Sequence, residues 1–207
     1  MKYIKDFRHK RVSENATVED FLKELTRKSI HIFSAISVFF AHFFFIPTIC
    51  LLGFGLLGYV ICEVLRLQGI RVPLISHITQ CASRVEDEGR FVLGPVTLVL
   101  GIMLALFLFT EPISTVAIFS LSFGDGFASL IGKIYGVSRF KIIKQKTLLG
   151  SFSCFCAVFV STFFVLKNLL LAFFIAIVAT LVEVLPLKNF DNIVIPVIVG
   201  IFTSFIV

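Results

Sequence analysis

Long apolar stretches separated by short polar segments dominate the sequence. A helix needs about 20 predominantly apolar residues to cross the hydrocarbon core of a bilayer, and most of these stretches approach that length. The last stretch is shorter, which leaves tilt, incomplete crossing or local thinning of the bilayer open. The pattern predicts an all-α fold, a polytopic transmembrane helix bundle of about seven spans at residues 29–46, 48–65, 91–109, 113–131, 148–166, 169–187 and 193–207.

Composition agrees with this pattern. Hydrophobic residues make up 57% of the chain and charged residues only 15%, and the mean hydropathy of +1.00 lies far from that of soluble domains. Residues 1–28 are basic and are predicted as a cytoplasmic segment that includes an amphipathic helix, because Thr17 and Asp20 have the spacing of a capping box. Residues 29–207 are predicted as a single transmembrane domain.

The distribution of lysine and arginine predicts the orientation. If the spans alternate in direction, residues 1–28, 66–90, 132–147 and 188–192 lie on one side of the membrane and hold every lysine and arginine except Lys167. Basic residues are enriched in cytoplasmic loops, so this side and the N-terminus are predicted to be cytoplasmic. Because membrane orientation explains the positions of these lysines and arginines, no nucleic-acid partner is predicted.

An aspartate stands between two glycines inside an otherwise apolar span, at Gly124, Asp125 and Gly126. A carboxylate near the bilayer centre costs on the order of 2.5 to 3.5 kcal/mol, so Asp125 is expected to face protein or water instead of lipid. Helix packing is the alternative role for the glycines, including Gly132. A Walker A loop is excluded because the spacing is one residue too long and Ile134 replaces the required Ser or Thr.

A second cluster precedes the first span. Glu24, Arg27, Lys28 and His31 recur at i, i+3, i+4 and i+7, so one helical face carries them all. This face is interpreted as an anion clamp at the membrane surface. An interfacial amphipathic helix whose charges reach the lipid headgroups is the alternative.

Two further polar groups lie at the same membrane face. Lys146 and Thr147 stand at the mouth of the fifth span, where ammonium groups and exposed backbone N–H groups suit phosphate, although membrane orientation alone would also explain the lysine. Glu183 and Asp191 flank a proline-interrupted turn, and Asn192 opens the last span. Asp191 has a helix cap as its alternative role.

Glu63 and Arg66 end the second span at i and i+3, a spacing that a local ion pair also explains. The predicted site therefore combines carboxylates, which suit Mg²⁺ together with phosphate and water, with basic residues that suit phosphate. Phosphoryl transfer needs mainly positioning and charge neutralisation. The residues thus favour a reaction on a nucleotide at the membrane surface.

In their order and spacing, these motifs resemble those of the polytopic CTP-dependent lipid kinases, a group that includes dolichol kinase, phytol kinase and diacylglycerol kinase and is related to the phosphatidate cytidylyltransferases. The resemblance rests on ExxRKxxH at 24–31, ExxR at 63–66, GDGxAxxxGxxYG at 124–136, KTxxGS at 146–151, and Glu183 with DNxxxP at 191–196.

The resemblance implies CTP as phosphate donor, Mg²⁺ or another divalent metal, and a membrane lipid alcohol such as diacylglycerol, a polyprenol, dolichol or phytol as acceptor. It implies catalytic roles for Asp125, Asp191, Glu183 and Lys28, metal binding by Asp125, Asp191 and Glu183, and nucleotide binding by Arg27, Lys28, Gly124, Gly126, Gly132, Lys146, Thr147 and Asn192. Leu149 departs from the relatives, which often carry an acid before the glycine.

Two alternative functions remain open. Nucleotidyl transfer of the phosphatidate cytidylyltransferase type is disfavoured because the long cytoplasmic motif of that branch is absent from the sequence. A small proton- or cation-coupled transporter would need polar residues throughout the bilayer, and the outer halves of the spans carry almost none. The active site is expected on the cytoplasmic face of a bacterial inner membrane or the endoplasmic reticulum, in an undetermined oligomeric state.

Overall fold

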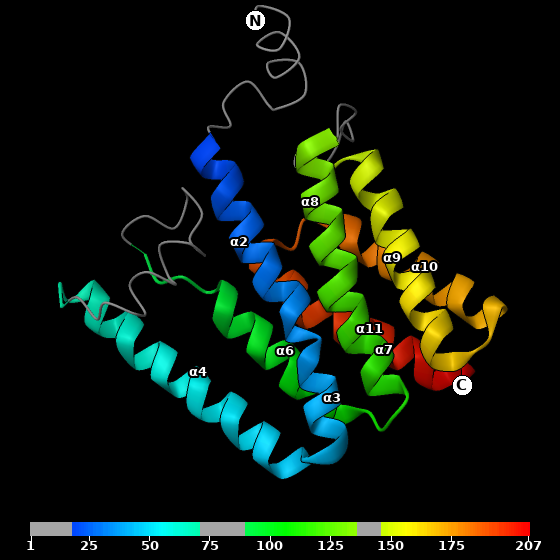
Figure 1. The fold of residues 1–207 in the computed structure, drawn as a ribbon, viewed down its shortest axis with the longest axis horizontal. Helices are drawn as coiled ribbons and strands as arrows, with labels where there is room; N and C mark the ends of the chain where they lie inside the picture. Colours follow the sequence, from blue (N-terminus) through cyan, green and yellow to red (C-terminus); the bar gives the residue numbers. More distant parts are fainter. Residues whose placement is uncertain (1–17, 71–89, 136–145) are drawn as a thin grey trace, which may run out of the picture.

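A computed structural model of the chain describes residues 18–70, 90–135 and 146–207 (Figure 1). Predictions that concern residues 1–17, 71–89 and 136–145, including most of the basic N-terminal segment, lie outside the described residues. The described part contains helices and no strand, which confirms the all-α fold. The helices are α2 (Val18–Ser34), α3 (Ile36–Phe43), α4 (Phe45–Leu67), α6 (Gly94–Leu108), α7 (Ile113–Phe119), the π-helix η2 (Ser120–Asp125), α8 (Gly126–Tyr135), α9 (Leu148–Leu166), α10 (Leu169–Val184), the 3₁₀-helix η3 (Lys188–Phe190) and α11 (Asp191–Ile206).

Each predicted span coincides with helix, but not all of the helices have the length and apolar character needed to cross a bilayer. Among the described residues, four do: Phe45–Leu67, Ile113–Tyr135, Leu148–Leu166 and Lys188–Ile206. The helices α6 and α10 are apolar and shorter, and the first predicted span is divided between α2 and α3. The chain therefore has the character of a membrane protein, while seven spans and a cytoplasmic N-terminus stay predictions.

The helices form a bundle with α4 at its edge (Figure 1). Helix α2 packs against η2 and α8, α8 packs against α9, α9 against α10, and α11 against both α6 and α10. The core between them is apolar and includes Ile118, Leu121, Ile175 and Val199. In contrast, α4 exposes large apolar side chains such as Phe54, as expected for a surface that contacts lipid.

Close helix contact at the α6–α11 interface depends on a glycine. A Cβ atom on Gly101 would overlap the main-chain carbonyl oxygen of Asn192. Because the obstacle is backbone, it cannot turn away as a flexible side chain would. Gly101 thus holds the N-terminal end of α11 against the middle of α6.

Gly101→Ala is expected to lower the free energy of unfolding by about 1 to 3 kcal/mol, the usual range for overpacking a tight contact. The control is Gly55→Ala on α4, where a Cβ atom meets nothing within 4 Å and alanine should stabilise the helix by about 0.5 to 1 kcal/mol. Unfolding in detergent micelles measures both. Equal effects of the two substitutions would contradict the packing role of Gly101.

The helix that carries Asp125 is interrupted. Helix α7 passes into the π-helix η2, which ends at Asp125, and α8 continues from Gly126. Such π-helical segments are rare and frequently lie at functional sites. Here the interruption falls where the chain faces α2, which brings Asp125 to the polar face of that helix.

Candidate functional site

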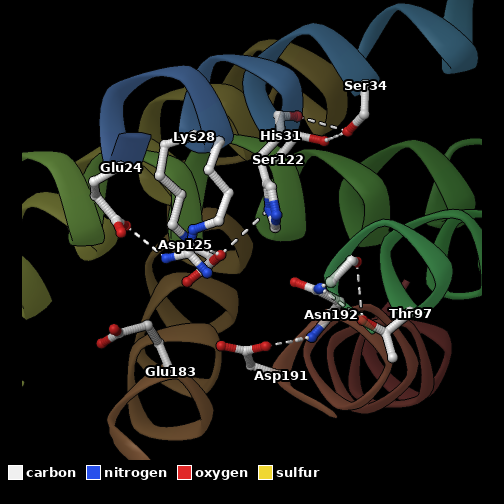
Figure 2. A network of polar contacts seen from close by, with 12 residues as sticks. Glu24, Lys28, His31, Ser34, Thr97, Ser122, Asp125, Glu183, Asp191 and Asn192 are labelled. Atoms are coloured by element: carbon white, nitrogen blue, oxygen red, sulfur yellow. Dashed lines mark hydrogen bonds and ion pairs between the residues drawn. The ribbon is translucent and has the colours of Figure 1, made fainter. Parts of the chain in front are cut away.

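A buried ion pair joins α2 to the end of η2. The Nζ atom of Lys28 donates a hydrogen bond to Oδ2 of Asp125, and each residue is only 1% exposed (Figure 2). The attraction between two opposite charges in contact offsets part of the cost of burying them, and removal of either partner would leave the other charge buried and unpaired. The fold therefore places Asp125 against protein, as predicted.

The other residues of the predicted α2 face point the same way. The guanidinium of Arg27 donates from Nη2 to Oε1 of Glu24 at 2.6 Å, and Nζ of Lys133 lies 3.9 Å from Oε2 of Glu24. His31 is 4% exposed, and its Nδ1 lies 3.4 Å from Oδ2 of Asp125. These contacts show that the face is directed into the bundle, which an interfacial helix would not require.

The charges around Glu24 act on its ionisation. Burial alone would raise the pKa of the Glu24 carboxyl, but the positive charges of Arg27, Lys28 and Lys133, with the hydrogen bond from Arg27, lower this pKa below its ordinary value. Glu24 is therefore ionised at neutral pH. It neutralises part of the positive charge on α2.

A second ion pair lies between the start of α9 and the end of α10. Nζ of Lys146 donates to Oε1 of Glu183 at 2.5 Å, and Oγ of Ser151 donates to Oε2 of Glu183 at 3.4 Å. Burial lowers the pKa of Lys146, but the negative charges of Glu183, Asp125 and Asp191, with the hydrogen bond to Glu183, outweigh this effect and raise the pKa above its ordinary value. Lys146 thus lies within the field of all three predicted carboxylates.

The start of α11 is tied to the start of α6. The main-chain N–H of Asn192 donates to Oδ1 of Asp191 at 2.9 Å. The side-chain amide of Asn192 donates to Oγ1 of Thr97 at 2.9 Å and to the carbonyl oxygen of Gly94 at 3.3 Å (Figure 2). The predicted residues Asp191 and Asn192 therefore stand at a junction of two helices, both of them buried.

A small pocket lies between α2, α6 and η3–α11. Its wall includes Arg27, Lys28 and His31 from α2, Pro95 and Leu98 from α6, and Asp191 and Asn192 from α11. The α6 residues were not predicted as part of the site, because an apolar helix start gives no chemical signal. His31 was predicted to lie on this face of α2 but not to act as a catalytic, nucleotide-binding or metal-binding residue.

Four predicted nucleotide-binding residues have packing roles. A Cβ atom on Gly124 would lie 2.9 Å from a side chain of α9, one on Gly126 2.9 Å from a side chain of α2, and one on Gly132 2.7 Å from Oγ1 of Thr147. Thr147 itself caps α9, since its Oγ1 accepts from the N–H of Gly150 at 3.1 Å. Helix packing, the alternative role given for the glycines, accounts for these close approaches. Nucleotide binding by these four residues stays a prediction.

The predicted metal ligands are gathered without forming a closed metal site. Among the described residues, no group of three or more His, Cys, Asp or Glu side chains is arranged to hold an ion. Asp125 is paired with Lys28, and Glu183 with Lys146. Metal binding by Asp125, Asp191 and Glu183 therefore stays a prediction.

The predicted Glu63–Arg66 pair forms and reaches beyond its own helix. Glu63 is 0% exposed, and Arg66 donates to both of its carboxylate oxygens at 2.8 Å. The carboxylate also accepts a hydrogen bond from the main-chain N–H of Val92 at 2.9 Å. Arg66 also donates to the carbonyl oxygen of Arg90 at 2.8 Å. The hydroxyl of Tyr59 donates to the carbonyl oxygen of Val92 at 3.0 Å. The pair therefore anchors the segment that leads into α6.

Glu63→Ala is expected to lower the free energy of unfolding by about 1 to 3 kcal/mol, chiefly because the buried N–H of Val92 loses its acceptor. Glu63→Gln keeps an acceptor for that N–H and should lose less. Unfolding of the purified protein in detergent measures both variants. A larger loss for glutamine than for alanine would show that the hydrogen bond to Val92 is not what matters.

Comparison with known proteins shows similarity to plant enzymes. The chain is 26% identical over 158 residues to "Probable phytol kinase 1, chloroplastic" of Oryza sativa subsp. japonica, which covers 65% of this chain and 49% of the relative. It is 28% identical over 214 residues to "Probable phytol kinase, chloroplastic" of Triticum aestivum, a match that covers 84% of this chain and 64% of the relative. It is 29% identical over 153 residues to "Probable phytol kinase 1, chloroplastic" of Glycine max, covering 65% and 51%.

The chain thus spans roughly half to two thirds of the length of these curated relatives. No family model and no solved structure matches it. The similarity agrees with the resemblance found in the motifs, which pointed to lipid kinases including phytol kinase.

Proposed function

We propose that this chain is a membrane-embedded kinase that transfers the γ-phosphate of a nucleotide to a lipid alcohol of the prenyl kind, such as phytol. The similarity to proteins named as probable phytol kinases supports the activity and the class of acceptor. CTP is proposed as the donor on the resemblance of the motifs. The site is proposed to lie at the cytoplasmic ends of the helices, where the lysines and arginines are concentrated.

One observation carries the proposal: Asp125, Glu183 and Asp191 are buried in the helix bundle, and two of these acids are directly paired with lysines. Helix packing in a membrane does not require charges, and each one costs free energy to bury. Phosphoryl transfer uses both kinds of charge, cations for the phosphates and carboxylates for a metal and for the hydroxyl proton.

In the proposed reaction, Arg27, Lys28 and Lys146 bind and neutralise the phosphate chain. Asp125 and Asp191, with Glu183, would hold Mg²⁺, which when bound supplies further neutralisation of the phosphate oxygens. The hydroxyl oxygen of the lipid forms a bond to the γ-phosphorus as the bond to the bridging β–γ oxygen breaks. One of the carboxylates accepts the hydroxyl proton, so that a lipid monophosphate and a nucleoside diphosphate leave.

The test is transfer of label by the purified chain in lipid nanodiscs. CTP, ATP, GTP and UTP labelled at the γ-phosphate are each offered with phytol, a polyprenol, dolichol and diacylglycerol, and we expect a labelled lipid monophosphate from CTP and a prenyl alcohol. CTP labelled at the α-phosphate, offered with phosphatidate, distinguishes nucleotidyl transfer. No labelled lipid from any alcohol and nucleotide would remove the kinase proposal.

A further inference from the structure

The pocket between α2, α6 and η3–α11 occupies the junction of two groups of helices. Helix α2 packs against η2 and α8, whereas α6 packs against α11, α4 and α7 (Figure 1). The wall of the pocket combines polar and apolar side chains. Lys28, His31 and Asn192 are polar and buried, whereas Ile30 and Leu98 are apolar, and Ile30 is 40% exposed.

The wall of the pocket contains a buried ring nitrogen that makes no hydrogen bond. Nδ1 of His31 has no hydrogen-bond partner among the described residues, although the side chain is only 5% exposed, and its polar neighbour Oδ2 of Asp125 lies 3.4 Å away. A buried polar atom of this kind usually has a partner in the functional state of a protein, supplied by water or a ligand. His31 therefore marks a place where a small polar group is expected to bind.

Asn192 supplies a second hydrogen-bonding group there. Its amide nitrogen must face the carbonyl oxygen of Gly94, because that oxygen only accepts hydrogen bonds. The amide oxygen is consequently turned away from α6, toward the side on which Asp125 lies (Figure 2). An acceptor on Asn192 and a ring nitrogen on His31 together match a hydroxyl group, which both donates and accepts.

The charge balance also favours a neutral group over a polyphosphate in this pocket. Arg27 is paired with Glu24 and Lys28 with Asp125, so both cations at the wall have carboxylate partners. A triphosphate carries several negative charges and would need cations in excess. Arg27 and Lys28 fit a position at the boundary of the pocket, facing a phosphate chain that approaches from the side of Lys146.

We infer that this pocket binds the hydroxyl end of the acceptor lipid, held by His31 and Asn192, with the apolar chain leaving between α2 and α6 over Ile30 and Leu98. The inference rests on the proposed function in taking a lipid alcohol as the acceptor. It adds where the acceptor binds and which residues contact it. A hydroxyl placed there lies next to Asp125 and the cations that would hold the γ-phosphate.

The direct test is photolabelling of the purified chain in nanodiscs, without nucleotide. The probe is a phytol analogue with a diazirine near its hydroxyl end, and labelled peptides are identified by mass spectrometry. We expect label on the α2 segment around Ile30 and the α6 segment around Leu98, reduced by excess phytol but not by the hydrocarbon phytane. Label confined to other helices, label that phytol does not reduce, or no label at all would overturn the inference.

A kinetic test uses a matched pair of substitutions on α2. Ile30→Trp places a large side chain at the apolar opening and is expected to raise the KM for phytol about tenfold while the KM for the nucleotide stays within about twofold. Leu25→Trp is the control, because Leu25 is 37% exposed, similar to Ile30, but is outside the pocket wall. Equal KM values for phytol in the two variants would overturn the inference.

The two proposals fail in different ways. Photolabelling at α2 and α6 in a protein that phosphorylates no alcohol would keep the pocket as a lipid-alcohol site and remove the kinase. Phosphorylation of phytol with labelling elsewhere and an unchanged KM in Ile30→Trp would keep the kinase and remove the pocket.

Discussion

Asp125→Asn is expected to abolish lipid phosphorylation and to destabilise the protein. Asparagine cannot balance the ammonium of Lys28, and removal of one partner of a buried ion pair typically costs about 3 to 5 kcal/mol. The substitution also removes a proposed metal ligand, so the rate should fall by at least about 10²-fold. Transfer of label from γ-labelled CTP to phytol and unfolding in detergent measure the two effects.

A double substitution separates catalysis from stability at this pair. Lys28→Met with Asp125→Leu removes both buried charges and replaces them with apolar side chains, a change that is often neutral or stabilising. We expect the double variant to recover the stability lost by Asp125→Asn while it remains inactive. Recovery of both stability and transfer would show that the pair only holds α2 against η2, and that the carboxylate has no part in the reaction.

Local features of the fold were predictable because helix geometry relates neighbouring residues directly. The fifth predicted span, 148–166, has the bounds of α9 in the structure. The spacings of Glu24 with Arg27 and of Glu63 with Arg66 place each pair on one helical face, and both ion pairs form. In these cases the hydrophobic period and the charge spacing determine the outcome without information from the rest of the chain.

Contacts between distant segments could not be predicted in the same way. Lys28 and Asp125 are 97 positions apart, and their contact depends on how α2 docks on η2 and α8. The sequence placed both on one membrane face but gave no pairing. The sequence likewise did not distinguish a packing role from a nucleotide-binding role for the glycines. A glycine indicates that another group approaches closely, but not which group it is.

The pocket was missed for a related reason. Its α6 side is lined by Gly94, Pro95 and Leu98, which carry no polar side chain and give no chemical signal in the sequence. Its polar side includes Asn192, whose side-chain amide donates to Gly94 and Thr97 of another helix. The charged residues in and near the spans were conspicuous in the sequence, but the pocket that they share with the start of α6 becomes visible only after the helices are assembled.

Arg27→Lys is expected to impair use of the nucleotide and to leave use of the alcohol nearly unchanged. Arginine presents its donors in a planar fork, and in this structure Nη2 is held by Glu24 while the buried Nε has no hydrogen-bond partner among the described residues. A lysine ammonium keeps the charge but not the fork. We expect kcat/KM for CTP to fall by about 10- to 100-fold, the size of losing one charge-assisted hydrogen bond of about 1.5 to 3 kcal/mol.

The control for this prediction is another cation on the same helix. Lys23 is exposed on α2, so Lys23→Gln removes a charge at the surface and should change kcat/KM for CTP by less than about twofold at physiological salt, where exposed charges are screened. A comparable loss in both variants would mean that the general positive charge of α2 attracts the nucleotide. A loss confined to Arg27, with an unchanged KM for phytol, would mean that the guanidinium binds phosphate at one defined place, at the boundary of the pocket.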